Sequence, residues 1–219
     1  MAIARFKKVT MECRDPERVG AFWADVLGRT WKAYDADSGG VFGPTPRHTI
    51  WLTRTAEPKT VKNRVHLDVY ALSVAGLEVL GASILLPQGD GRTWTVMADP
   101  EGNEFCTFVR DELPEDRVAG LVADAADPRT AAQWWGDLFG VPVKHSDEGW
   151  SAIEQVPDLP MRSISVNPVP EPKTAPNRVR WEISVPAYAE LEAAGARPVG
   201  PGVYADPEGN EFGVVLRRS

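Results

Sequence analysis

One segment of the chain has ionisable side chains at every second position. His66 and Asp68 alternate with Val65, Leu67 and Val69. In a strand, neighbouring side chains point to opposite faces, so this pattern predicts one ionisable face and one apolar face. A histidine exchanges its proton near neutral pH, and a nearby carboxylate both shifts its pKa and accepts hydrogen bonds. The segment therefore predicts a wall suited to acid–base chemistry or to holding a polar ligand.

Two other segments have the same pattern. Glu104 and Cys106 share one strand face while Phe105 turns away, and Lys8 and Glu12 share a face of the first strand. A lysine on such a wall could stabilise an anionic oxygen, while a carboxylate could move a proton. The predicted catalytic residues are His66, Lys8 and Glu104, and the predicted ligand-binding residues around them are Glu12, Asp68 and Cys106.

Each of these residues also has a structural interpretation. His66 could be a hydrogen-bonded wall residue, and Cys106 could be a small buried hydrophobic residue. Glu104 recurs in both copies of a repeated turn, which favours a salt bridge, with Lys8 as one partner. His48 could be a histidine at a strand end. The residue types alone leave both interpretations open.

The elements that must position these residues come from an internal duplication. The sequence Asp-Pro-Glu-Gly-Asn-Glu-Phe occurs at Asp99–Phe105 and again at Asp206–Phe212. Glu57–Thr60 is repeated at 171–174, again followed by Asn-Arg-Val. Landmarks in the same order predict two copies of one fold, residues 1–112 and 113–219, each of ordinary domain size. Residues 111–116 are predicted to link the two copies.

Within each half, the pattern predicts strand, helix and then several strands, twice over. Asp15 is a suitable N-cap, Pro16 suits the first helical position, and Gly28 suits the C-terminal end. The second half repeats this design between Asp127 and Gly140. A shorter helix is predicted after the strand that begins at residue 64, and its counterpart lies in the second half. The chain therefore contains four strand–helix–strands units.

These motifs resemble the vicinal oxygen chelate superfamily, which includes glyoxalase I, extradiol dioxygenases and bleomycin-resistance proteins. The similarity is greatest to its glyoxalase-like branch, through the segments 57–69 and 99–106. The resemblance implies an α+β fold: a tandem repeat of two glyoxalase-like domains, each a pair of βαβββ modules forming a cup-shaped mixed sheet. It covers nearly the whole chain, but one fold hosts many reactions.

The resemblance also implies where a divalent metal would bind. Its ligands come from the first and last strands of the modules, at positions that fall on Lys8, His66 and Cys106, with His48 nearest the fourth. A protonated lysine has no lone pair, so His66 and His48 remain as the metal-ligand candidates. The equivalent positions of the second half offer no donor; they are Gly120, Arg180 and Gly213. A metal is therefore expected, if anywhere, in the first half, and no other cofactor is predicted.

Composition limits the partners. The net charge of −7 argues against nucleic acid and anionic membranes, which require clustered Lys and Arg. No apolar run is long enough to span a bilayer, and two cysteines are too few for a disulfide framework. We expect a cytoplasmic monomer or homodimer whose partner is a small molecule.

Two functional classes fit these observations. The first is a protein that binds a small organic molecule in one cup, with the family's metal-ligand set largely lost. The alternative is a lyase, isomerase or dioxygenase of the glyoxalase type, with or without metal, centred on His66. The loss of ligand residues favours the first class, and the carboxylates near His66 favour the second.

Overall fold

The computed structural model describes residues 2–217 and contains the four expected βαβββ modules. The first module comprises β1 (Arg5–Cys13), α1 (Pro16–Leu27), β2 (Thr30–Ala33), β3 (Ser38–Phe42) and β4 (Ile50–Arg54). The second comprises β5 (Val65–Ala71), α2 (Val74–Val79), β6 (Ser83–Leu86), β7 (Thr95–Ala98) and β8 (Glu104–Val109). The third comprises β9 (Val118–Ala125), α3 (Pro128–Phe139), β10 (Val143–His145), β11 (Ser151–Glu154) and β12 (Ser163–Pro168). The fourth comprises β13 (Val179–Val185), α4 (Tyr188–Ala193), β14 (Arg197–Gly200), β15 (Val203–Ala205) and β16 (Glu211–Leu216).

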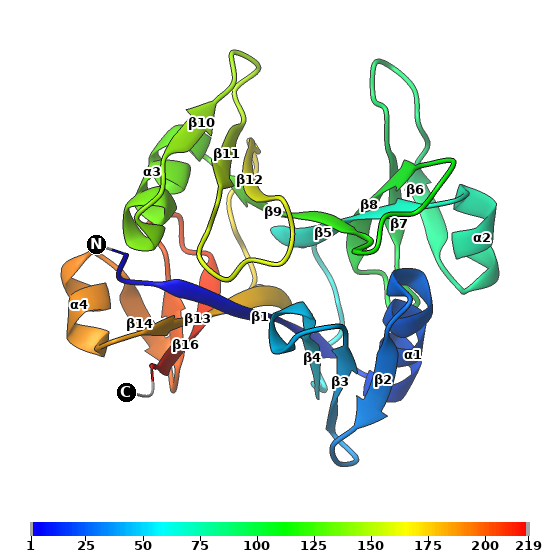
Figure 1. Ribbon diagram of the computed structural model, residues 1–219, viewed down its shortest axis with the longest axis horizontal. Helices are drawn as coiled ribbons and strands as arrows, with labels where there is room; N and C mark the ends of the chain where they lie inside the picture. The colour runs from blue at the N-terminus through cyan, green and yellow to red at the C-terminus, as the bar shows by residue number, and fades with distance from the viewer. Residues whose placement is uncertain (1, 218–219) are drawn as a thin grey trace.

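The modules pair across the two halves of the chain. Sheet A has the order β14-β15-β16-β13-β1-β4-β3-β2 and so joins the first module to the fourth. Sheet B has the order β10-β11-β12-β9-β5-β8-β7-β6 and joins the second module to the third. The α+β class and the tandem modules are confirmed, and each mixed sheet is built from two modules. In Figure 1 sheet B lies above sheet A, and the two curve in opposite directions.

Each sheet is joined at its centre by one antiparallel pair of first strands. β1 pairs with β13, and β9 pairs with β5. Both pairs contain a register shift at equivalent positions. In β1 it lies between Phe6 and Lys8, and in β9 it lies opposite the step from Asp68 to Val69 of β5. Such bulges bend a strand and redirect its side chains, and they are common beside functional sites. The duplicated modules therefore meet with the same geometry in both sheets.

The two long helices have the caps that the sequence predicts. The Asp15 carboxylate accepts a hydrogen bond from the Arg18 amide at 3.1 Å, and Gly28 ends α1 at a φ of 63°. Asp127 and Gly140 do the same for α3, with Gly140 at a φ of 67°. Only glycine takes up this left-handed conformation without strain, so the glycine after each helix fixes where the chain turns.

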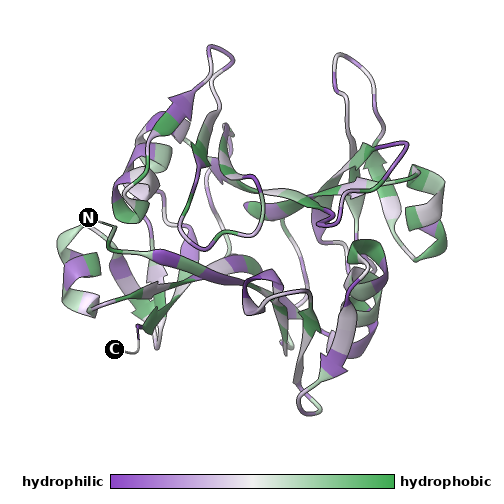
Figure 2. Ribbon diagram, in the orientation of Figure 1, coloured by the Kyte–Doolittle hydropathy of each residue, from purple (hydrophilic) through white to green (hydrophobic). Residues whose placement is uncertain are grey.

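The core is one continuous hydrophobic cluster that both halves share. Helix α1 packs Trp23 against Phe105 of β8, with ring centroids 5.2 Å apart. Helix α3 packs Trp135 against Phe212 of β16, at 4.8 Å. Figure 2 shows hydrophobic segments in all four modules, where helices and strands pack together. The modules of one half therefore pack through their helices, while the sheets join the halves.

The repeated turn holds these helices by a buried carboxylate. Trp23 Nε1 donates to Asp99 Oδ2 at 3.3 Å, and Trp135 Nε1 donates to Asp206 Oδ2 at 3.1 Å. Each carboxylate also accepts backbone amide hydrogen bonds from its own turn, including the amide of Asn103 or Asn210. The Asp-Pro-Glu-Gly-Asn motif is thus a link between a turn and the helix of the preceding module.

The second repeated motif, the connector between modules, is tied to the same turn. Lys59 Nζ lies 2.6 Å from Glu104 Oε1, and the Asn63 amide donates to Glu104 Oε2 at 3.1 Å. Lys173 and Asn177 bind Glu211 in the same way. The predicted structural salt bridge of Glu104 is therefore present, but its partner is Lys59 and not Lys8.

The expected boundary between residues 112 and 113 lies in the segment joining β8 to β9, which has no helix or strand. Among residues 2–217, no helix combines the length and the apolar character that crossing a bilayer would require.

Burial of the turn carboxylate predicts a pH-dependent stability. Desolvation raises the pKa of Asp206 to about 6. The folded state therefore holds this proton at a higher pH than the unfolded chain, whose Asp pKa is about 3.9. This contribution to stability is fully present below about pH 4 and is lost as the pH rises through about 6.

We expect the free energy of unfolding of the native protein, relative to Asp206→Asn, to fall by about 2 to 3 kcal/mol between about pH 4 and pH 7. Urea titrations of both proteins across this range measure the difference. A difference that stays constant or grows with pH would contradict the raised pKa.

Candidate functional site

The central strands of the two sheets carry equivalent rows of side chains. In sheet B, Asp68 of β5 lies between Cys106 of β8 and Gly120 of β9. In sheet A, Glu182 of β13 lies between Gly213 of β16 and Lys8 of β1. Both rows stand beside the equivalent bulges, so they occupy the same place in each concave face. The two faces, here called the sheet A cup and the sheet B cup, can therefore be compared residue by residue.

In the sheet A cup, the charged groups pair with one another. Lys8 Nζ lies 3.1 Å from Glu182 Oε1 and 5.9 Å from the centroid of the Trp51 ring. Arg180 donates a hydrogen bond to the Glu12 carboxylate. A Cβ atom on Gly213 would lie 3.2 Å from Glu182 Cγ, so the glycine gives this side chain its room. The charged groups of the sheet A cup are therefore paired with one another.

The sheet B cup brings three potential donors together at its floor. His66 Nε2 lies 3.5 Å from Cys106 Sγ and 3.5 Å from Asp68 Oδ1. His66 is 8% exposed and Cys106 9%, whereas the side chain of Asp68 is 21% exposed. Asp68 Oδ1 and His66 Nδ1 are buried and make no hydrogen bond within the described part of the chain. A buried polar atom without a partner is costly, so these atoms are suited to a ligand.

The thiol in this group is not an activated nucleophile. Burial raises the pKa of Cys106 above its usual value, and the Asp68 carboxylate raises it further. Burial likewise raises the pKa of Cys13, in the other sheet, to about 12. A thiol rather than a thiolate therefore stands beside His66 at neutral pH.

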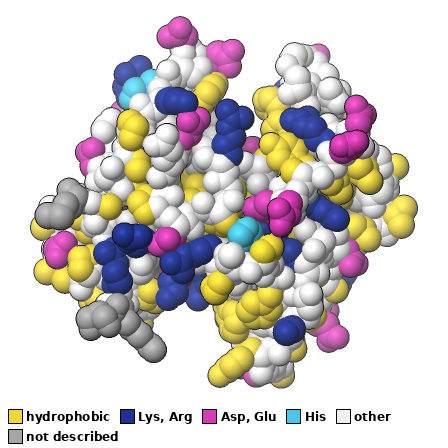
Figure 3. Space-filling view, in the orientation of Figure 1, with side chains coloured by type: hydrophobic (Ala, Val, Ile, Leu, Met, Phe, Trp, Pro, Cys, Tyr) yellow, Lys and Arg dark blue, Asp and Glu magenta, His cyan; other side chains and the backbone are white. Residues whose placement is uncertain are grey.

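A cavity of about 330 Å³ opens above Asp68 on the same face. Aromatic side chains from three strands or their ends form part of its wall: Tyr70, Phe108 and Trp150. Arg110 and Arg162 also line it. Figure 3 shows the molecule hollowed between the two arms of sheet B, with cationic and hydrophobic side chains nearby. Its size and mixed lining are those of a site for a small molecule.

Gly120 gives this cavity its depth. It stands where the sheet A cup has Lys8, and it has no side chain to pair with Asp68. A Cβ atom added there would lie 3.2 Å from the Ser163 carbonyl oxygen, so a side chain would require only a small shift of the neighbouring strand. The exchange of lysine for glycine therefore distinguishes the acid that is paired in sheet A from the acid that faces a cavity in sheet B.

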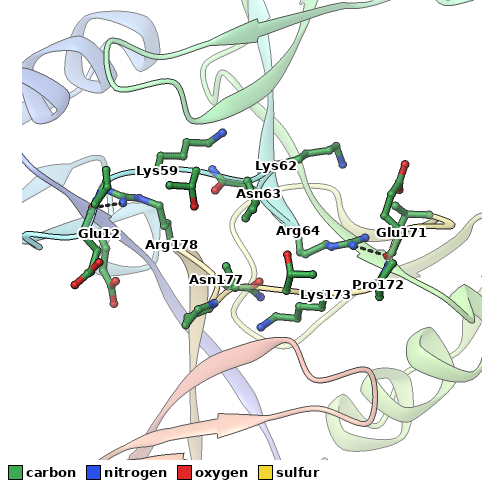
Figure 4. A pocket seen from close by; sticks show the side chains of 18 residues that line it. Glu12, Lys59, Lys62, Asn63, Arg64, Glu171, Pro172, Lys173, Asn177 and Arg178 are labelled. Carbon is green, nitrogen blue, oxygen red and sulfur yellow. Dashed lines mark hydrogen bonds between the residues drawn. The ribbon is translucent and has the colours of Figure 1, made fainter.

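A second cavity, of about 550 Å³, lies between the two repeated connectors. Arg178 Nη1 donates to the Glu57 carbonyl at 2.6 Å, and Arg64 donates to the Glu171 carbonyl (Figure 4). Figure 4 shows these two arginines at opposite ends of the space. Each arginine therefore donates a hydrogen bond to a backbone carbonyl of the connector in the other half of the chain.

The structure divides the predicted site residues between the two sheets. His66, Asp68 and Cys106 come together as expected. Lys8 and Glu12 lie in the sheet A cup instead, because β1 pairs with the fourth module and not with the second. The expected single cup containing all six residues is therefore not formed.

Two further predicted residues have structural contacts. Glu104 is engaged by the connector through Lys59. His48 ends a short 3-10 turn, Pro46–His48, where its Nδ1 lies 2.8 Å from Thr45 Oγ1 and its Nε2 lies 3.6 Å from Asp116 Oδ2. The structure does not bring His48 to His66, because the two residues belong to modules in different sheets.

The predicted site residues do not include the wall of the cavity. Tyr70 and Phe108 continue the alternation of Asp68 and Cys106, so the strand period places them on the same face. Trp150, Arg162 and Gly120 lie in the other half of the chain, and only the cross-half pairing places them here.

Comparison with known proteins identifies relatives of this architecture. A family model for the glyoxalase-like domain matches residues 8–108 and 120–215. The structure of glyoxalase I from Zea mays is similar over 97% of this chain and 92% of that chain, with 16% identity and a TM-score of 0.67. A "putative dioxygenase" from Bacillus subtilis is similar over 97% of this chain and 84% of that chain, with 13% identity and a TM-score of 0.66. At such low identity the two structures show a shared fold alone. A search of curated proteins finds no match.

The raised thiol pKa values predict low cysteine reactivity. At neutral pH, we expect Cys13 and Cys106 in the folded protein to react with a disulfide reagent about 100-fold or more slowly than in denaturant. Stopped-flow absorbance with the native protein and with Cys106→Ser assigns the two thiols. A rapid single equivalent that is absent from Cys106→Ser would show that Cys106 is a thiolate.

Proposed function

Because the chain belongs to the glyoxalase-like domain family, we propose that it uses the sheet B cup to bind a small organic molecule. The observation that carries this proposal is the asymmetry of the two cups. The central acid of the sheet A cup, Glu182, pairs with Lys8, whereas the central acid of the sheet B cup, Asp68, lines a cavity.

The residues of the sheet B cup have complementary roles in this proposal. Tyr70, Phe108 and Trp150 supply apolar surface for the body of the ligand. Asp68 supplies an acceptor on the cavity lining: its Oδ1 lies 3.5 Å from His66 Nε2 and makes no hydrogen bond within residues 2–217, so a ligand's polar group would satisfy it. Hydrogen bonds in such a dry environment orient a ligand strongly, because the alternative is an unpaired buried group.

Ligand binding predicts a thermal shift that depends on the sheet B cup. In a screen of small organic molecules, we expect a ligand that raises the melting temperature of the native protein. His66→Ala and Phe108→Ala should abolish or strongly reduce the shift, because His66 contacts the cavity-lining Asp68 and Phe108 forms part of the wall.

The matched control is Arg180→Ala, because Arg180 occupies the position in the sheet A cup that His66 occupies in the sheet B cup. Each variant is compared with its own ligand-free melting temperature, so that altered stability does not enter the result. Shifts lost only with Arg180→Ala would move the site to sheet A and overturn the proposal.

A second candidate function rests on the donor set itself. His66, Asp68 and Cys106 present one ligand atom each, all within 4.8 Å of one another. An imidazole, a carboxylate and a thiolate suit zinc and related divalent metals, whose bonds of about 2.0 to 2.3 Å would draw these atoms slightly closer. Three protein ligands with an open side facing a cavity are typical of catalytic metal sites. The residues therefore fit a divalent metal.

A metal at this position would act as a Lewis acid toward a ligand oxygen in the cavity. The chain would contribute the three donor side chains, and the aromatic wall would orient the ligand and exclude water. Cys106 would have to lose its proton on binding, so the metal affinity would rise with pH. This second candidate is an enzyme of the glyoxalase type, in keeping with the alternative left open by the sequence.

Metal analysis separates the two candidates. If the second is correct, the protein purified without chelator and dialysed exhaustively should carry one equivalent of a divalent metal. His66→Ala and Cys106→Ser should lose it, while His48→Ala should keep it, because His48 lies in the other sheet. Less than about a tenth of an equivalent in the native protein, both as purified and after incubation with zinc, would eliminate the second candidate.

A further inference from the structure

The sheet A cup contains a cation of its own chain at the place where the sheet B cup is open. Lys8 stands opposite Glu182, and Gly120 stands opposite Asp68. Each pair lies next to the equivalent bulge, and each acid has a residue of the last strand on its other side. The position of the Lys8 side chain in one cup is therefore the position of the cavity in the other.

The groups around the Lys8 ammonium indicate which kind of chemical group fits at this position. Its Nζ lies 3.1 Å from the Glu182 carboxylate, and the face of Trp51 lies 5.9 Å away. A carboxylate with an aromatic face is a favourable setting for an ammonium group, through charge and through the ring quadrupole.

The sheet B cup keeps the acceptor and has Gly120, not a cation, at the position equivalent to Lys8. Asp68 provides a carboxylate in the place of Glu182, and its Oδ1 makes no hydrogen bond within residues 2–217. Tyr70 and Phe108 lie beside it along the strands, and their ring centroids are 6.4 Å apart. The Arg110 guanidinium lies 5.0 Å from the centroid of Tyr70, so this ring already holds a cation on its face.

On these grounds, which rest on the proposed function, we propose that the sheet B cup takes the ammonium group of a small arylalkylamine. The ammonium pairs with Asp68 in the space that Gly120 leaves open, as Lys8 pairs with Glu182 in the other cup. The aromatic ring of the ligand packs against Tyr70, Phe108 and Trp150, which line the cavity. The cavity volume of about 330 Å³ suits a molecule of this size.

Calorimetry with three probes that share a phenethyl group tests the charge. Phenethylamine carries the ammonium, 2-phenylethanol is neutral, and 3-phenylpropionate is anionic. With chelator-treated protein, we expect phenethylamine to bind about tenfold or more tightly than either of the others, because a charge-assisted hydrogen bond to a partly buried carboxylate is strong. Equal affinity for the alcohol, or preference for the acid, would overturn the inference.

Variants test the position. Asp68→Asn should weaken phenethylamine binding about tenfold or more, and the matched change Glu182→Gln in the sheet A cup should leave it within about twofold. Gly120→Lys should also abolish binding, because the new ammonium occupies the place of the ligand's. Gly120→Ala is its steric control and should retain binding. Retention of phenethylamine binding in both Asp68→Asn and Gly120→Lys would overturn the inference. If Asp68→Asn folds poorly, retention of binding in Gly120→Lys alone overturns it.

The results also distinguish this inference from the proposed function. If the alcohol or the acid binds best and Phe108→Ala abolishes that binding, the sheet B cup is a ligand site but not one for amines. If ligands from the wider screen lose their thermal shift only in Arg180→Ala, both proposals fail.

Discussion

The antiparallel pairing of first strands across the two halves is the constraint on which the structure depends. β1 with β13 and β5 with β9 form the centre of each sheet, and the other strands extend outward from them. This pairing brings side chains far apart in the sequence into one row, such as Lys8 with Glu182. It also sets which residues share a concave face. The contents of each cup are therefore decided by strand partners rather than by sequence neighbours.

The same geometry gives the two cups opposite character. Duplication placed an acid at the centre of each row, Glu182 or Asp68, beside a bulge. In sheet A the neighbouring strand supplies the Lys8 ammonium, and the charge is neutralised within the fold. In sheet B the neighbouring residue is Gly120, and the acid faces a cavity. A single exchange at equivalent positions thus separates an acid paired within the fold from an acid that faces an open cavity.

The repeated motifs make the structural contacts that support both cups. Asp99 and Asp206 receive the indole N–H of Trp23 and Trp135, so each turn is fastened to a helix. The connectors fasten to the same turns through Lys59 and its counterpart. These contacts recur in both halves because both cups need the same support. Identity between the copies is therefore explained by shared structural contacts, whereas differences, as at His66 and Arg180, distinguish the two cups.

The sequence by itself determined the duplication, the four βαβββ modules, the helix caps and the inward face of each strand, because all of these follow from local spacing. It also identified His66, Asp68 and Cys106 as one group, since they lie on strands of a single module that must pair. Only the tertiary structure decided which modules share a sheet. The four modules have similar edges, so local pattern does not distinguish a partner in the same half from one in the other. That choice removed Lys8 and Glu12 from the site and brought Gly120, Trp150 and Arg162 into it.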